Sequence, residues 1–510
     1  MNKCIAQLIS ILLVSCFIIS CSSDSSTETL PEEVIKDSPD INKDGKLNIL
    51  VIGTSKSITY KASGFSPNEI ATQLSNILSQ DTALDLEVNI SFEDIYKSKQ
   101  TTYLLGQDAL EITTNHYIHS LMQYYYWPEG QSERLDNIAG KKGTTWDYVV
   151  IASDPFLVSQ LPGYNALGVN KIASKVAEGG AKPLLLMVWP KDETVTGKLN
   201  LFEEFTYRIA DHAKVYIDVI PAGLAWNELP ASKKDTASEH PTPNGAYVTA
   251  ASIYAQIVNK SAASSDYTYD DEIADLALKV KTSEENATHY TGERTFVSPF
   301  KGCFIDDSTL NYNHTGTSTE NGILNGLKWI IQKSDRTLVS GGTAPINFNY
   351  GRANTNFEAH KRYKIDPTKF DYSFGFPMQD HGLGVAETTM LYGIDKRSNE
   401  SHNGTDIGTA LYMIRNSELP HARAIPVRSL YAQIKEIIPS QTALRDEGHL
   451  HTNIDKAIGA FMYTLLTGDC VLGEEPADKN STQWKEWVSH KVGYETAYTL
   501  MTLKAAPNCN

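Results

Sequence analysis

The sequence predicts an α/β fold, a parallel sheet with helices on both faces, for about the first half of this 510-residue chain. Strand-like and helix-like stretches alternate from residue 46 to about residue 260, and several strand-like runs are apolar without interruption. A turn of small residues follows the first of these runs. Uninterrupted apolar runs suit strands that are covered on both faces, and the alternation suits β-α-β units.

Residues 1–21 are expected to be an export signal. Lys3 precedes an apolar run over residues 5–19, too short for a comfortable membrane span, and Ser20 is a small residue directly before Cys21. The segment resembles a bacterial lipoprotein signal with Cys21 as the lipidated residue; Cys16 and an ordinary cleaved signal peptide are the alternatives. We therefore expect an exported protein, anchored by lipid to the cell envelope on the periplasmic or the surface face of the outer membrane.

Residues 22–47 are rich in Ser, Thr, Glu, Asp and Pro and are expected to be a flexible tether. Within the tether, residues 40–45 match the first half of a calcium loop, in which alternating oxygen ligands precede a turn glycine. The twelfth position is Val51, where a calcium loop has Glu. The alternatives are a calcium site and a plain turn stabilised by Asp and Asn side chains.

The elements of the first domain, residues 48–265, follow from local pattern. Strands are expected over residues 47–53, 86–91, 146–152, 183–189 and 214–220. Helices are expected over residues 66–79, 110–125, 165–178 and 200–212. Ligands of open parallel sheets collect at the carboxyl ends of the strands, and Ser55 follows the first strand at such an end.

Ser55 and His240 form the minimal apparatus for acyl transfer if the fold brings them together. Serine is a poor nucleophile until a neighbouring imidazole accepts its proton, and the ordinary pKa of histidine, about 6.5, permits that exchange. Backbone N–H groups in the turn after Ser55 can stabilise a developing oxyanion. The structural alternative is that Ser55 only caps a helix.

Four segments resemble, in order and spacing, the conserved blocks of the SGNH (GDSL-type) hydrolase superfamily. They are residues 51–57, 146–150, 183–190 and 240–247. The resemblance covers about 215 residues and implies a three-layer, flavodoxin-like fold. It also implies ester hydrolysis, often deacetylation of carbohydrate, with Ser55 as the nucleophile and His240 as the general base.

The chain departs from that family at three expected positions. The aspartate that stands three residues before the histidine is replaced by Ala237, which leaves Asp235 as the candidate acid and Glu239 as an alternative. Gly106 is the candidate glycine of the oxyanion hole, and residues 152–155 occupy the place of an asparagine-bearing loop. The alternative to an esterase is therefore a catalytically degenerate, SGNH-like glycan-binding or accessory lipoprotein.

The second half, residues 301–510 after a connector over residues 266–300, repeats patterns of the first. Residues 424–427 and the later His449 resemble residues 219–222 and the later His240, and residues 370–372 resemble residues 146–148. This half is expected to be a divergent SGNH-like copy or, alternatively, an α+β appendage. Candidate site residues of the copy are Ser308, Asp446 and His449, with Asp446 at the family spacing.

Composition restricts the partners. The formal net charge of −16 disfavours nucleic acid and anionic membrane, so we expect a small-molecule or polysaccharide substrate, and contact with the membrane only through the lipid. No cofactor and no metal ion are expected. Beyond Cys21 the cysteines are Cys303, Cys470 and Cys509, and Cys303 with Cys470 is one pairing for a single disulfide. Residues 124–127, the densest aromatic cluster, suit core packing better than sugar stacking.

Overall fold

The computed structural model describes most of both halves of the chain. The described residues are 38–54, 69–95, 98–105, 110–117, 120–127, 130–189, 199–234, 241–267, 269–283, 309–314, 318–340, 372–375, 388–392, 422–446 and 449–509. Residues 39–510 form one compact unit, which is the part described below.

A five-stranded sheet forms the centre of the first half. Its strands are β1 (Lys46–Gly53), β2 (Glu87–Asp94), β5 (Tyr148–Ala152), β6 (Lys182–Leu186) and β7 (Asp218–Ile220). The spatial order is β2-β1-β5-β6-β7 and every pair is parallel. In order of sequence this is 2-1-3-4-5, the flavodoxin-like arrangement. The predicted three-layer α/β/α fold is thus confirmed.

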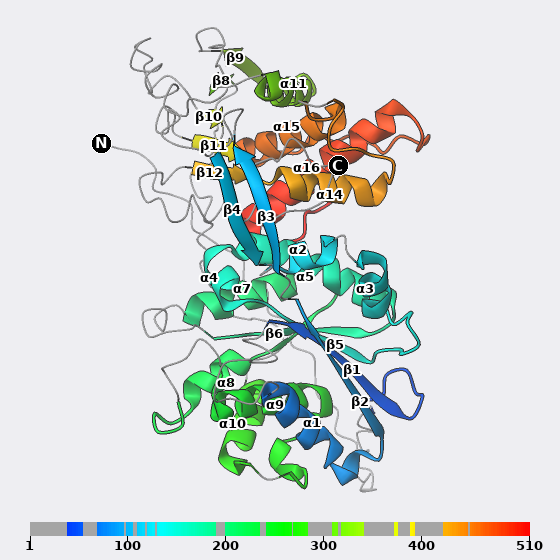
Figure 1. Ribbon diagram of the computed structural model, residues 1–510, viewed down its shortest axis with the longest axis vertical. Helices are drawn as coiled ribbons and strands as arrows, with labels where there is room; N and C mark the ends of the chain where they lie inside the picture. The colour runs from blue at the N-terminus through cyan, green and yellow to red at the C-terminus, as the bar shows by residue number, and fades with distance from the viewer. Residues whose placement is uncertain are drawn as a thin grey trace, which may run out of the picture. The chain divides into compact units, whose positions relative to one another are not determined.

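Helices cover the two faces of this sheet (Figure 1). One layer contains α2 (Leu121–Tyr126), α3 (Gln131–Ile138), α4 (Pro155–Gln160), α5 (Pro162–Glu178) and α7 (Leu199–Asp211). The other contains α1 (Glu69–Ser79), α8 (Ala222–Glu228), α9 (Pro243–Val258) and α10 (Asp271–Thr282). Short 3-10 turns lie at Thr82–Leu84 and Ala262–Ser264.

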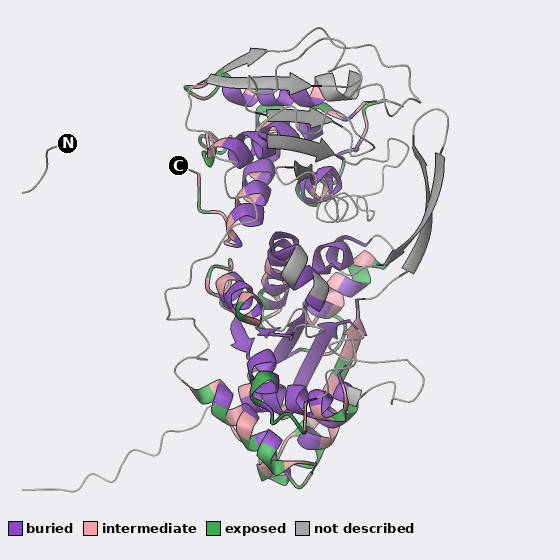
Figure 2. Cartoon of the chain, turned by 90° about the vertical axis from the view of Figure 1, so that its left-hand side faces the viewer, coloured by how far each residue is buried: buried purple, intermediate pink, exposed green. Residues whose placement is uncertain are grey.

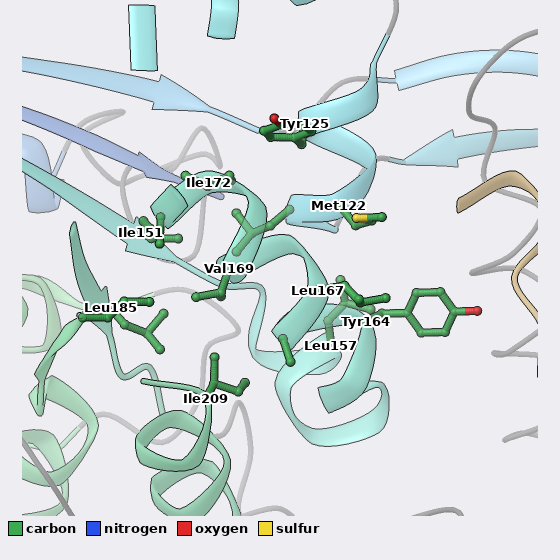
Figure 3. Packing of buried hydrophobic residues seen from close by; sticks show 14 of the residues in the cluster. Met122, Tyr125, Ile151, Leu157, Tyr164, Leu167, Val169, Ile172, Leu185 and Ile209 are labelled. Carbon is green, nitrogen blue, oxygen red and sulfur yellow. The ribbon is translucent and has the colours of Figure 1, made fainter. Parts of the chain in front are cut away.

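The core of the first half lies between the sheet and these layers. Figure 2 shows the central strands in the buried class, and Figure 3 shows α5 packed over the strands, with Val169 and Ile172 near Ile151 and Leu185. These four side chains are at most 1% exposed. Each buried aliphatic side chain of this kind stabilises the fold by about 1.5–3 kcal/mol relative to exposure. The uninterrupted apolar runs therefore have the buried, two-sided environment that they predict.

One predicted helix, over residues 110–125, is wrong. Its first part is β4 (Leu110–Tyr117), which pairs antiparallel with β3 (Ser98–Leu105), and only its last part is helical, in α2. β4 contains the β-branched run at residues 112–114, which favours a strand. Ser120 ends the strand region and caps α2, because its hydroxyl accepts hydrogen bonds from the N–H groups of Met122 and Gln123.

Contacts among the described residues extend past both predicted limits of the first domain. The folded unit begins at Pro39, before the predicted end of the tether at residue 47. In the loop before β1, the Asp40 carboxylate accepts hydrogen bonds from the N–H groups of Asp44 and Gly45, at 3.2 and 2.9 Å. These contacts are those of the Asp- and Asn-stabilised turn. At the other end α10 packs on α9 and α8, so the domain continues beyond residue 265.

The second half contains another parallel five-stranded sheet. Its strands are β8 (Thr309–His314), β9 (Thr337–Ser340), β10 (Tyr372–Gly375), β11 (Thr388–Tyr392) and β12 (Ala422–Ile425). The order β9-β8-β10-β11-β12 is again 2-1-3-4-5 in sequence, with every pair parallel. Its described helices are α11 (Ser318–Ile331), α14 (Val427–Ile437), α15 (Thr452–Thr467) and α16 (Thr482–Thr502). The second half therefore has an α/β architecture and not the alternative α+β one.

The aromatic cluster at residues 124–127 joins the two halves. Tyr125 and Tyr126 donate hydrogen bonds to the Glu436 carboxylate in α14, at 2.8 and 2.6 Å, and Lys171 forms an ion pair with the same group. All four aromatic side chains are at most 9% exposed, so the preference for core packing is confirmed. Burial alone raises the pKa of Glu436, but the Lys171 ammonium and the two tyrosine hydroxyls outweigh it and lower that pKa.

A disulfide joins Cys470 to Cys509, with 5.8 Å between the Cα atoms. The pairing of Cys303 with Cys470 is therefore wrong; Cys303 lies outside the described residues. α16 brings the C-terminal tail back beside the segment that follows α15, a proximity that cysteine spacing alone cannot reveal. Among the described residues, no helix has the length and apolar character required to cross a membrane.

Candidate active site

The carboxyl edge of the first sheet is where the described chain stops just before Ser55, and the first turn of α9 lies at the same edge. β1 ends at Gly53, Thr54 is 2% exposed, and Ser55 is the next residue, just outside the described part of the chain. Gly53 pairs in register with Asp94 at the end of β2, and Ile52 pairs with Ile151 near the end of β5. The chain thus leaves β1 at the point where the strand order reverses, which is where ligands of such sheets bind.

The first turn of α9 lies at the same edge. A Cβ atom on Gly245 would lie 3.5 Å from Cζ2 of Trp189, and Trp189 follows the carboxyl end of β6. Thr242 caps α9, because its hydroxyl accepts a hydrogen bond from the Gly245 N–H at 3.4 Å. His240 lies outside the described residues, three positions before α9 begins. The two segments that carry Ser55 and His240 therefore start from one edge of one sheet.

Polar contacts fix both ends of the loop that contains His240. The Asn244 side-chain amide donates to the Lys233 carbonyl oxygen at 3.1 Å, which ties the residues before the loop to those after it. The Lys233 ammonium contacts the carboxylates of Asp270, which caps α10, and of Glu272 in its first turn, and these contacts raise the pKa of Lys233. The ends of the short loop over residues 235–240 are thus held by α9 and α10.

Asp154 and Ser153 are polar groups at this edge whose burial the sequence did not reveal. They follow the end of β5 and are each 2% exposed. Among the described residues the Ser153 hydroxyl has no hydrogen-bond partner. The sequence signal that could have identified these two residues is a polar pair directly after a fully apolar strand. The end of that strand lies where the strand order of the sheet reverses, which is where ligands bind.

Two tryptophans lie at this edge, and one of them, Trp189, lies beside the first turn of α9. The rings of Trp189 and Trp226 stack with centroids 5.6 Å apart and planes inclined by 8°. Trp226 is 9% exposed and Trp189 is partly buried. The Lys234 ammonium lies 5.6 Å from the Trp226 ring centroid, within the range of a cation–π contact. The pair gives this edge an aromatic wall with a cation at one end.

Gly106 and Asp235 both lie outside the described residues. The strands on either side of Gly106, β3 and β4, form an antiparallel hairpin, not an edge of the parallel sheet. The role of Gly106 as an oxyanion donor stays a prediction. Asp235 directly follows Lys234, at the start of the loop that contains His240, and stays a prediction.

In the second half Asp446 and His449 are in direct contact. Nδ1 of His449 lies 2.6 Å from Oδ1 of Asp446, and the same oxygen accepts the His449 backbone N–H at 3.0 Å. Ser308 lies outside the described residues. β8 begins at the next residue, Thr309, and its carboxyl end is His314.

The described part of the chain has no cluster of metal-ligating side chains. Its His, Cys, Asp and Glu side chains form no group of three or more that could hold a metal ion. His451, next to the Asp446–His449 pair, caps α15 by accepting the Asn453 N–H on Nδ1 at 3.2 Å. Burial, with help from Lys485 and Arg445, lowers the pKa of His451.

No family model and no curated protein matches the chain. Solved structures do match, at low identity. A protein from Slackia heliotrinireducens assigned as an SGNH hydrolase is 15% identical, with 41% of this chain and 97% of that chain covered and a TM-score of 0.29. An acetylxylan esterase from Geobacillus stearothermophilus is 12% identical, with 42% and 95% covered and a TM-score of 0.29. A DUF4886 family protein from Bacteroides uniformis is 12% identical, with 48% and 98% covered and a TM-score of 0.27. The solved structures to which this chain is similar thus include an SGNH hydrolase and an acetylxylan esterase.

Proposed function

We propose that the chain is a serine esterase of SGNH type that removes acetyl or other acyl groups from carbohydrate at the bacterial cell envelope. The observation that supports the proposal best is the shared edge of the first sheet. β1 ends there two residues before Ser55, and α9 begins there three residues after His240. Acyl transfer requires a serine and a histidine close together, and two segments that meet at one edge of a sheet can provide that pair.

In the proposed reaction the Ser55 hydroxyl attacks the ester carbonyl while His240 accepts its proton. Backbone N–H groups after β1 stabilise the oxyanion, and His240 then returns the proton to the leaving sugar oxygen. Water repeats the sequence on the acyl-enzyme, with His240 again as the base, and releases the carboxylic acid. Asp235 is the proposed partner of the histidine, because Ala237 cannot fill that role.

The aromatic wall supports a carbohydrate substrate. The faces of sugar rings carry C–H groups that pack well on tryptophan, and the partly buried Trp189 borders the first turn of α9. The acidic composition agrees with a neutral ligand, since the formal net charge is −16. The alternative is that residues 235–240 of the chain itself cover the two tryptophans, in which case the tryptophans serve only for packing.

The location at the envelope rests on the N-terminal segment. Cys21 follows an apolar run and opens a polar stretch, as a lipidated cysteine does in a lipoprotein signal. Radioactive palmitate fed to expressing cells should label the chain, and Cys21→Ala should abolish that label. Cys16→Ala is the matched control and should retain it.

A second candidate function is glycan binding without catalysis, which Ala237 favours. A histidine with no orienting acid loses about four orders of magnitude in rate, although a serine–histidine pair retains some activity. Such a protein would bind acylated glycans through Trp189 and leave them intact.

Hydrolysis assays on residues 22–510 separate the two functions. 4-Nitrophenyl acetate and acetylated xylooligosaccharides serve as probes, with released acetate as the measurement. Ser55→Ala should lower the rate of acetate release by the proposed Ser55–His240 site to background. Ser57→Ala, the same change two residues later, should not lower it. Equal rates for the unmodified chain and for Ser55→Ala would refute the role of Ser55, and saturable glycan binding without acetate release would support the binding function.

A further inference from the structure

The two sheets correspond strand by strand. Both have the order 2-1-3-4-5, and the third strand begins at Tyr148 in one sheet and at Tyr372 in the other, each preceded by an aspartate. The fifth strand is followed in both halves by a proline, Pro221 or Pro426, that caps the next helix. This correspondence fixes which segments of the second half are equivalent to the site segments of the first.

The histidine segment is the first such equivalence. α9 and α15 each contain 16 residues and begin three residues after His240 and His449, respectively. Tyr254 and Tyr463 occupy the twelfth position of these helices, 0% and 2% exposed. α9 packs on α1 and α15 packs on α11, the helices that follow the first strand of each sheet. His449 and His240 thus have equivalent places in the sequence, three residues before equivalent helices.

The segment that carries the serine is the second equivalence between the two halves. Residues 53–55, Gly-Thr-Ser, close β1, and the same three residue types recur after β8 at residues 316–318. Ser318 is the first residue of α11. Ser308, by contrast, precedes β8 and cannot follow the carboxyl end of that strand. Ser318 is therefore the equivalent of Ser55.

The second half also has the acid that the first half lacks. Asp446 and His449 lie in a tight loop closed by an antiparallel bridge between Leu444 and Leu450. The 2.6 Å contact holds His449 through Nδ1, which directs Nε2 away from Asp446. An acid on Nδ1 fixes the tautomer in which Nε2 can act as a base. The corresponding residue of the first half is Ala237.

A cavity of about 300 Å³ lies between this loop and α11. It is lined by Gly322, Asn325, Gly326, Arg445, His449, Thr452, Asp455 and Lys456. Asp455 is 6% exposed, and its Oδ1 has no hydrogen-bond partner among the described residues. Ser318 lies one helical turn before Gly322, so the two positions share one face of α11.

Close contact between two helices fixes this arrangement. A Cβ on Gly326 would lie 1.9 Å from the Asp455 carbonyl oxygen, and one on Gly459 would lie 2.1 Å from the Gly326 carbonyl carbon. Glycine at both positions lets the backbones of α11 and α15 touch. The start of α11 is thereby held at a set position relative to the loop that begins α15.

We propose that this cavity is a second acyl-ester site, in which Ser318 is the nucleophile, His449 is the base and Asp446 positions His449. Only the substrate class, acylated hydroxyl compounds, rests on the proposed function. The Ser318 oxygen bonds to the carbonyl carbon and its proton passes to His449, which returns it to the alkoxide that leaves. Water then cleaves the new ester with the same base and releases the acid. The carboxyl group of Asp455 is available to bind a substrate hydroxyl.

A fluorophosphonate probe tests the proposal, because it phosphonylates only a serine whose proton a base removes, with loss of fluoride. Full-length chain in detergent is labelled, digested with trypsin and sequenced by mass spectrometry. Ser55 lies in the peptide of residues 47–56, and Ser318 in that of residues 302–328. We expect label on Ser318, a loss of about 10⁴-fold or more in its labelling rate in His449→Ala, and full label on Ser318 in Ser55→Ala.

Two matched variants keep the result interpretable. Ser308→Ala lies in the same peptide and should retain the label, as should His451→Asn, which preserves a side-chain cap for α15. Label on Ser55 is recorded separately, so the first site can fail while the second survives. No label on Ser318, label on Ser308 in its place, or undiminished label in a folded His449→Ala chain overturns the proposal.

Discussion

The two halves of the molecule share a strand order but differ in what completes their sites. The first sheet contains the eight-residue β1 and the fully buried β5, and its histidine loop has Ala237 where an acid would stand. The strands of the second sheet contain four to six residues, yet its histidine is held by Asp446. A well-formed sheet and a complete site are therefore separate properties, because the sheet depends on burial and the site on a few side chains in its loops.

The largest expected effect is at Asp446. Asp446→Asn should lower the rate of fluorophosphonate labelling at Ser318 by about 10⁴-fold, because His449 loses the acid that fixes its tautomer. Asp446→Glu should restore part of that rate, which a purely structural role would not predict. The measurement is the labelling rate of the 302–328 peptide against that of the 47–56 peptide. An unchanged rate at Ser318 would leave the two halves without a functional difference.

A second test uses the buried carboxyl of Asp455, which replaces the apolar Ala246 of the first half at the fourth position of the helix. Burial raises the pKa of Asp455 from 3.8 to about 8. Between these values the folded chain binds a proton that the unfolded chain does not, so stability falls as the pH rises from about 4 to 8. The loss is on the order of several kcal/mol.

Asp455→Asn should remove that dependence. The measurement is the free energy of unfolding in urea at pH 5 and pH 9, compared between the original chain and the variant. Other groups titrate equally in both chains, so the difference between them isolates Asp455. A variant that loses as much stability as the original chain would show that this carboxyl is solvated.

The third test concerns the contact between α11 and α15. Gly326→Ala should destabilise the second half by about 3 kcal/mol, because the new Cβ meets backbone that cannot move aside. Gly322→Ala, one turn earlier, meets the Asp455 side chain and should cost less. Thermal unfolding of both variants gives the comparison; equal costs would mean that the helices separate easily.

The fourth test restores the missing acid of the first half. Ala237→Asp should raise the labelling rate of Ser55 by about 10²-fold or more, because an acid at this position can orient His240. Asp235→Ala in the same background should then have little effect, whereas in the original chain it should lower the rate. If Ala237→Asp has no effect, Ser55 and His240 do not form a pair.

The smallest expected effect is at the joint between the halves. Glu436→Gln removes the charge that binds Lys171 and weakens two tyrosine hydrogen bonds, for a loss of about 1–2 kcal/mol after allowance for partial exposure. Glu178→Gln, an exposed acid paired with Lys141 and Lys175, is the control and should cost at most about 0.5 kcal/mol. Equilibrium unfolding in urea measures both.

The fold of the first half follows from the sequence because its strands are locally encoded. Apolar runs such as residues 148–151 suit only strands buried on both faces, and their order along the chain, with helices between, leaves few topologies. The predicted helix over residues 110–125 failed because a helix and half of a hairpin share an apolar stretch there. Which of the two forms depends on the partner strand β3, which lies earlier in the chain.

The sequence by itself determined the parallel sheet of the first half, the segments with Ser55 and His240, and the Asp446–His449 spacing. These features depend on residue type and short-range periodicity, which a single chain displays directly. Only the tertiary structure decided that Cys470 pairs with Cys509, that Glu436 joins the halves, and that β8 begins after Ser308. Such features depend on which distant segments pack together, and packing complementarity among many side chains leaves no local mark in the sequence.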